Sequence, residues 1–161
     1  MPPEKLIEVA VASNVKHNHT IQKDSIMTYT NAQFRSVLNG HGFAYAPEPD
    51  SNFPISSNNS PLVDKITVDA IKDFQAYFKL KVDGIAGPIT MAKAEQAMRI
   101  LQDNLNTVIK ANIPANQPFY GPKTVAAVKE FERRHGYYVD GVASLAMRQK
   151  LNEMARLALT K

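Results

Sequence analysis

The sequence predicts an all-α protein made of two tandem three-helix units. The first observation is an internal repeat, because residues 67–94 align with residues 124–151 at an offset of 57. The second is the recurrence of apolar residues at intervals of three and four, which is typical of amphipathic helices. The third is that the longest apolar runs contain four residues, far short of the roughly 18 that span a membrane. We therefore expect no membrane insertion.

The repeat is close enough to define the two units. Ten of the 28 aligned positions are identical: Thr67/Thr124, Val68/Val125, Ala70/Ala127, Lys72/Lys129, Phe74/Phe131, Val82/Val139, Asp83/Asp140, Gly84/Gly141, Ala86/Ala143 and Lys93/Lys150. Upstream, Phe34-Arg35-x-x-Leu38 is similar to Leu101-Gln102-x-x-Leu105 at an offset of 67. We expect a first unit at residues 30–97, a second unit at 98–161, and an N-terminal extension at 1–29 that is helical or irregular.

The offset difference places ten extra residues in the first unit, within HGFAYAPEPDSNFPISSNNSPL. Its prolines and its Ser/Asn clusters cannot sustain a helix, so a long surface loop is expected at residues 43–66. The next helix of each unit is expected to begin at an N-cap threonine, Thr67 or Thr124. The apolar stripes that follow are Val68, Ile71, Phe74 and Phe78 in the first unit and Val125, Val128 and Phe131 in the second.

A Val-Asp-Gly sequence ends the segment after each of these helices. Glycine accepts a positive φ and aspartate can bond its own backbone, so Asp83, Gly84, Asp140 and Gly141 are predicted to be structural turn residues. Pro88 suits the first turn of a further helix. Its apolar stripe, Ala94, Met98, Leu101, Leu105 and Val108, continues to about Lys110 without a breaker and predicts one long helix shared by both units. The last helix repeats this pattern with Met147, Leu151, Met154 and Ala158.

Composition excludes several classes of protein. The chain has no cysteine, which excludes disulfides, thiolate metal sites and cysteine nucleophiles. The net charge of +4 is uneven, because residues 1–66 carry five basic and six acidic side chains and residues 67–161 carry fourteen and nine. The basic residues are interspersed with acids, so no nucleic-acid partner is predicted. The first residues do not have the pattern of a secretory signal.

The repeated motifs resemble the peptidoglycan-binding module of bacterial and phage cell-wall hydrolases. The second unit supplies Leu101-Gln102, Leu105, Tyr120-Gly121-Pro122-Lys123-Thr124, Ala127-Val128, Phe131 and Val139-Asp140-Gly141. The first supplies Leu38, Gly42-Phe43, Thr67, Ala70-Ile71, Phe74-Gln75, Val82-Asp83-Gly84 and Gly87-Pro88-x-Thr90. The first unit departs from the pattern at Asp64-Lys65, and the second at Glu132 and Ser144-Leu145. The resemblance implies a tandem all-α module that binds the cell wall without catalysis and works outside the cytoplasm.

Aromatic and basic residues near the turns are the predicted ligand-binding residues. Tyr77 and Phe78 precede the first Asp-Gly turn, Tyr137 and Tyr138 precede the second, and Tyr120 opens the helix opposite. One member of each adjacent pair is expected in the core and the other on the surface, where it can stack on a sugar or flank a peptide stem. Lys79, Lys81, Arg133 and Arg134 can pair with stem carboxylates, although a solvated basic face is the alternative.

No cofactor, metal site or catalytic residue is predicted. His17-Asn18-His19 has a metal-like spacing but lacks a nearby third ligand, and His41 and His135 are distant in sequence. Asp83 and Asp140 are expected to serve the turns rather than to form a catalytic pair. An enzyme would have to place its chemistry in residues 1–30, which are too few and too polar. The predicted function is peptidoglycan binding, and the alternative is a protein-interaction module that kept the fold alone.

Overall fold

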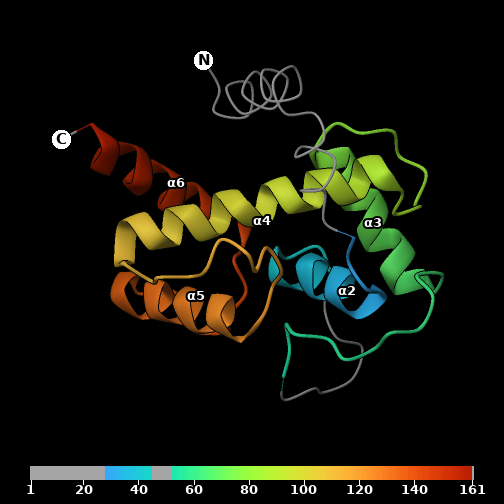
Figure 1. The fold of residues 1–161 in the computed structure, drawn as a ribbon, viewed down its shortest axis with the longest axis horizontal. Coiled ribbons are helices and arrows are strands. Elements are labelled where there is room, and N and C mark those ends of the chain that lie inside the picture. Colours follow the sequence, from blue (N-terminus) through green and yellow to red (C-terminus); the bar gives the residue numbers. More distant parts are fainter. Residues whose placement is uncertain (1–27, 45–51, 161) are drawn as a thin grey trace.

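The computed structural model describes residues 28–44 and 52–160, and over these ranges it consists of helices joined by turns and loops (Figure 1). The helices are α2 (Asn31–Gly40), α3 (Lys65–Tyr77), α4 (Pro88–Ile109), α5 (Pro122–His135) and α6 (Leu145–Leu159). Within the described ranges there is no strand, which confirms the predicted all-α class. Residues 1–27 of the predicted helical or irregular N-terminal extension, with the His17/His19 pair, lie outside the described residues.

The long helix α4 organises the fold. It runs across the molecule in Figure 1, with α3 near one end and α5 and α6 along the other part. It packs against both α5 and α6, while α2 packs against α3. Pro88 occupies the first turn of α4, as the sequence predicts, and the helix continues without a break across the expected boundary between the units.

A single cluster of buried apolar residues joins all five helices. The predicted stripe on α4 is buried at Ala94, Met98, Leu101 and Leu105. The prediction for α6 needs one correction, because Ala155 is buried and Ala158 is exposed. The last turn of α6 extends beyond the core, so the apolar spacing there has nothing to pack against.

The starts of α3 and α5 also need a correction. Each helix begins two residues before the predicted threonine, so that Thr67 and Thr124 are the third residues of their helices. Asp64 caps α3, because its carboxylate accepts a hydrogen bond from the Thr67 N–H at 3.2 Å. The α5 helix follows Gly121, and its first residue, Pro122, has a fixed φ suited to that position. Both threonines are buried instead of capping.

Candidate functional site

Tight turns follow α3 and α5 and have the same construction. Gly84 and Gly141 have φ values of +73° and +79°, in the left-handed region that the turn motif predicts. A Cβ added at Gly84 would lie 3.0 Å from Val68 Cγ1, so the packing as well as the backbone favours glycine. The Asp83 carboxylate accepts a hydrogen bond from the Ile85 N–H at 2.9 Å, and Asp140 does the same for Val142. These contacts support the structural role predicted for the two Asp-Gly pairs.

Gln75 anchors the turn of the first unit to α3. Its Oε1 accepts hydrogen bonds from the N–H groups of Asp83 and Gly84 at 3.0 and 2.9 Å. Its Nε2 donates to Asp83 Oδ1, to the Ile85 carbonyl and to Thr90 Oγ1, at 2.9 to 3.1 Å. An amide is suited to this position because it offers an acceptor and two donors at once.

Glu132 takes the place of that glutamine in the second unit. Its Oε1 accepts hydrogen bonds from the N–H groups of Asp140 and Gly141 at 3.1 and 2.9 Å. A carboxylate has no donor for the remaining acceptors of the turn. Burial raises the pKa of Glu132 to about 7 against the lowering effect of the Gly141 N–H, and the Asp140 carboxyl adds to the increase. Near neutral pH the Glu132 carboxyl group in this turn is therefore partly protonated.

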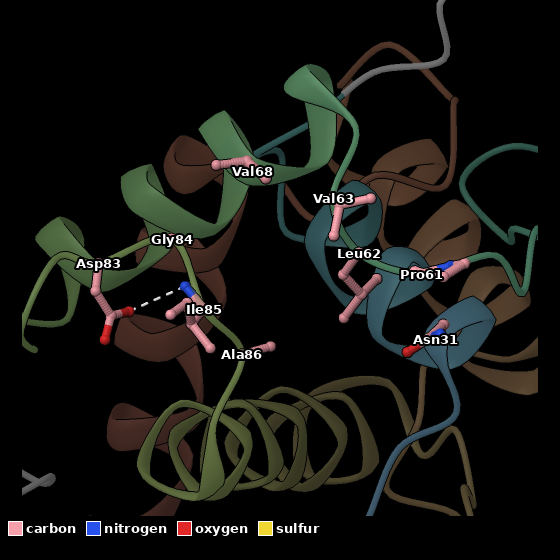
Figure 2. Close-up of a pocket in the computed structure, with 9 residues that line it drawn as sticks. All are labelled: Asn31, Pro61, Leu62, Val63, Val68, Asp83, Gly84, Ile85 and Ala86. Carbon is pink, nitrogen blue, oxygen red and sulfur yellow. Dashed lines mark hydrogen bonds between the residues drawn. The ribbon is translucent and has the colours of Figure 1, made fainter.

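An open groove lies beside the turn of the first unit (Figure 2). It has a volume of about 540 Å³ and is bordered by residues 61–63 before α3, by residues 83–86 after it, and by Asn31 and Val68. Most of the lining side chains are apolar. Val63 and Ile85 are 77% and 66% exposed, so this groove presents apolar surface to solvent.

Tyr120 fills the corresponding space in the second unit. Its hydroxyl donates a hydrogen bond to the Gly141 carbonyl at 2.6 Å and accepts one from the Ala143 N–H at 3.2 Å. The ring is 1% exposed and packs so tightly on Gly40 of α2 that a Cβ there would overlap it. The structure therefore places Tyr120 in the core, and the expected contact of this ring with a ligand is corrected for that reason.

Arg35 holds the long loop of the first unit, a role that the sequence reasoning missed. Its guanidinium donates to the carbonyls of Asn58, Ser60 and Pro61 and to the Asp64 carboxylate, at 2.6 to 3.0 Å. Burial acts to raise the pKa of Asp64, but hydrogen bonds from Arg35 and Thr67 hold it below its ordinary value.

Gln102 of α4 performs the equivalent task in the second unit. Its Nε2 donates to the carbonyls of Gln117 and Phe119 and to Thr124 Oγ1, at 2.8 to 3.3 Å. The signal for both residues was present in the sequence, because Arg35 aligns with Gln102 at the offset of 67. Where the second unit has Gln102 and Gly121, the first has Arg35 and Asp64, which form an ion pair at 2.8 Å.

Tyr77 lies in an aromatic cluster at the carboxyl end of α3. Its ring makes edge contacts with Phe43 and Phe78, with centroids 5.7 and 4.8 Å apart. The guanidinium of Arg148, from the second unit, lies over the Tyr77 ring at 5.6 Å and over the Phe43 ring at 6.0 Å. Tyr77 is 45% exposed, so one part of it remains accessible to a ligand.

The adjacent tyrosines after α5 divide as the sequence predicts. Tyr137 is partly buried and stacks on Phe131 with centroids 6.2 Å apart, whereas Tyr138 is 86% exposed. Arg133 and Arg134 each form an ion pair with Glu130, at 2.9 and 2.8 Å. A ligand carboxylate would therefore compete with Glu130 for these bases.

Lys79 and Lys81 are exposed on the segment between α3 and its turn. Lys79 has a φ of +61° and follows the end of the helix. The charge of Lys81 acts on Asp83, where hydrogen bonds from Ile85 and Gln75 are the larger causes of a lowered carboxyl pKa. The first turn thus carries a carboxylate and two bases close together in sequence.

The described residues contain no group of three or more His, Asp or Glu side chains that could hold a metal ion. His41 is fully buried, and its Nδ1 lies 2.9 Å from the Val37 carbonyl. His135 lies in the last turn of α5 and packs on Phe131, 4.3 Å between centroids. In the described part of the chain no helix is long and apolar enough to cross a membrane.

These features define a tandem repeat of helical units, one with an open groove and one with that space filled. The family model described as "Putative peptidoglycan binding domain" matches twice, at residues 33–93 and 94–151. The two matches cover most of the chain, which therefore belongs to the peptidoglycan-binding domain family. Comparison with curated proteins and with solved structures returned no match. The matches meet within α4, and the expected unit bounds of 30–97 and 98–161 stay a prediction.

Proposed function

We propose that the protein binds bacterial cell-wall peptidoglycan without cleaving it. The observation that carries this proposal is the tandem match to one binding-domain family over residues 33–151. A protein that binds the cell wall in this way acts outside the cytoplasmic membrane. The absence of catalysis is part of the proposal, and the turn geometry supports it. Asp83 and Asp140 are each hydrogen-bonded within their own turns, in separate units.

Exposed aromatic and basic side chains near the turns are the proposed contacts for the second unit. Tyr138 presents nearly its whole ring to solvent and can stack on a sugar face. Arg134 lies on the last turn of α5 and can exchange Glu130 for a stem carboxylate. Tyr77, Lys79 and Lys81 are the proposed contacts of the first unit.

The test is a pull-down with purified wall sacculi, with equal masses of chitin and DNA as controls. We expect enrichment on sacculi alone. Tyr138→Ala should weaken it while leaving the melting temperature nearly unchanged, because the side chain is exposed. Tyr137→Ala is the matched control for the neighbouring ring and should lower stability instead. Arg134→Gln should weaken the binding at low salt more than at high salt, because screening already reduces the charge pairing.

A protein partner is the second candidate. It is favoured by exposed apolar side chains: Val63 and Ile85 line the groove, and Ile89 is exposed in the first turn of α4. Failure of the protein to enrich on sacculi, with the fold intact, would reject wall binding and leave the interaction module as the remaining function.

A further inference from the structure

The groove of the first unit occupies the place that a tyrosine fills in the second. At the repeat offset of 57, Val63 corresponds to Tyr120, Gly84 to Gly141 and Ala86 to Ala143. Tyr120 is buried against its turn, while Val63 is 77% exposed beside an open space. The exchange of tyrosine for valine therefore leaves the first unit without the side chain that closes the second.

The backbone of the turn shows what that space can bind. In the second unit the Tyr120 hydroxyl bonds both the Gly141 carbonyl and the Ala143 N–H, so these two groups point to the same side. The Ala143 N–H also donates to the main-chain carbonyl of Gly40, at 2.7 Å. In the first unit the equivalent residues, Gly84 and Ala86, line the groove (Figure 2). Within residues 28–44 and 52–160, the Gly84 carbonyl and the Ala86 N–H form no hydrogen bond.

One carbonyl and one N–H, two residues apart and on the same side, are the groups that a parallel β-pairing offers to one residue of its partner. An extended peptide can donate its N–H to Gly84 and accept the Ala86 N–H at its carbonyl. The apolar walls at Leu62, Val63 and Val68 suit small side chains such as alanine methyl groups. The partly free carboxylate of Asp83, at the end of the groove, suits an ammonium group on the same peptide.

We propose that this groove binds the stem peptide of peptidoglycan by its main chain, and that the second unit, closed by Tyr120, has no such site. This inference rests on the proposed function. It deepens that function by naming the peptide as the part of the wall recognised here and by restricting its recognition to the first unit. The exposed aromatic residues outside this groove then bind the glycan.

The first experiment maps the site by NMR on the isotope-labelled full chain. A soluble stem tetrapeptide containing a diamino acid is titrated in, and stem-free glycan oligomers are titrated in parallel. We expect the tetrapeptide to shift the amide resonances of Ile85 and Ala86 and to leave those of Val142 and Ala143 unchanged. Equal shifts in both turns, or shifts with the glycan alone at Ala86, would overturn the proposal.

The second experiment uses variants matched between the units. Ile85→Glu puts a charge in the groove and should weaken tetrapeptide binding at least tenfold, whereas the equivalent Val142→Glu should leave it unchanged. Val63→Tyr introduces the side chain that closes the second unit and should weaken tetrapeptide binding as Ile85→Glu does. Both first-unit positions are largely exposed, so the fold should persist, and a thermal melt of each variant checks this.

The outcomes separate this inference from wall binding itself. Retention on sacculi together with loss of tetrapeptide binding in Ile85→Glu supports both. Retention on sacculi without any tetrapeptide binding to the unaltered protein rejects the inference and leaves wall binding standing. Absence of both rejects both. Undiminished tetrapeptide binding in a folded Ile85→Glu variant rejects the groove as its site.

Discussion

The side chain of Glu132 is hydrogen-bonded to the backbone of Asp140, while the carboxyl groups of the two residues repel each other. The Oε1 atom of Glu132 accepts a hydrogen bond from the Asp140 N–H at 3.1 Å, while burial raises the pKa of Glu132 to about 7 and the Asp140 carboxyl contributes to that increase. In the first unit the neutral amide of Gln75 bonds the equivalent turn, at Asp83. It also supplies the hydrogen-bond donor that Glu132 lacks when it is ionised.

Glu132→Gln should therefore stabilise the protein, most strongly above pH 7. The folded-state pKa lies above the ordinary value of 4.5, so the stability linked to protonated Glu132 is complete below pH 4.5 and is lost as the pH rises through about 7. We expect a gain of about 1–3 kcal/mol at pH 8 and a smaller gain at pH 5. Thermal unfolding at both pH values measures it, and equal gains would contradict the prediction.

Gln75→Glu is the reciprocal control for the first unit. It removes the Nε2 donor to Asp83 and Thr90 and places two carboxyl groups in one turn. We expect a loss of stability that grows between pH 5 and pH 8, in the opposite direction to Glu132→Gln. A loss independent of pH would show that the carboxyl pair is not the cause.

His41 should make the protein sensitive to acid. Burial first, and then the charge of Arg148, lower the pKa of His41 to about 3, against the opposing effect of the Val37 carbonyl. The folded value is below the ordinary value of 6.5, so this contribution is present above pH 6.5 and is lost as the pH falls toward 3. The slope is at most about 1.4 kcal/mol per pH unit. His41→Phe should lose less stability than the unaltered protein between pH 7.5 and 5 in urea unfolding, and parallel losses would rule out His41 as the sensor.

Arg35 and Asp64 should be energetically coupled. Arg35→Gln leaves loop carbonyls and the Asp64 carboxylate without their donor, and we expect a cost of about 2–4 kcal/mol. Asp64→Gly reproduces the residue found at the start of α5, so the cost of Arg35→Gln should fall by about 1 kcal/mol or more in that background. A double-mutant cycle by urea unfolding measures this coupling, and additive costs would contradict it.

Leu101→Ala should destabilise both units together. Leu101 is 3% exposed on α4, and its truncation should cost about 2–5 kcal/mol. A hydrogen bond from the Ala143 N–H to the Gly40 carbonyl, at 2.7 Å, also joins the units, and Tyr29, just before the first unit, donates to the Pro118 carbonyl of the second at 2.5 Å. Calorimetry should therefore show one transition that moves to lower temperature. Two separate transitions would place the boundary between the units outside α4.

The helices and their turns were predictable from the sequence because their causes are local. Ile71, Phe74, Val128 and Phe131 are buried on the stripes that their spacing predicts. Gly84 and Gly141 have the positive φ that an Asp-Gly turn requires. The exact first residue of α3 was not predictable, because Asp64 and Thr67 are both good caps and the choice depends on which side chain reaches the free N–H groups.

The position of Tyr120 was decided only by the tertiary structure. Its partners, Gly40 and Gly141, lie far from it along the chain. A local sequence pattern does not distinguish a tyrosine that stacks on a ligand from one that packs on the turn of its own unit. The groove arises in the same way, from residues before α3, residues after it and Asn31 of α2. Periodicity reports which face of a helix is buried, whereas the closing or opening of a surface depends on side chains that only folding brings together.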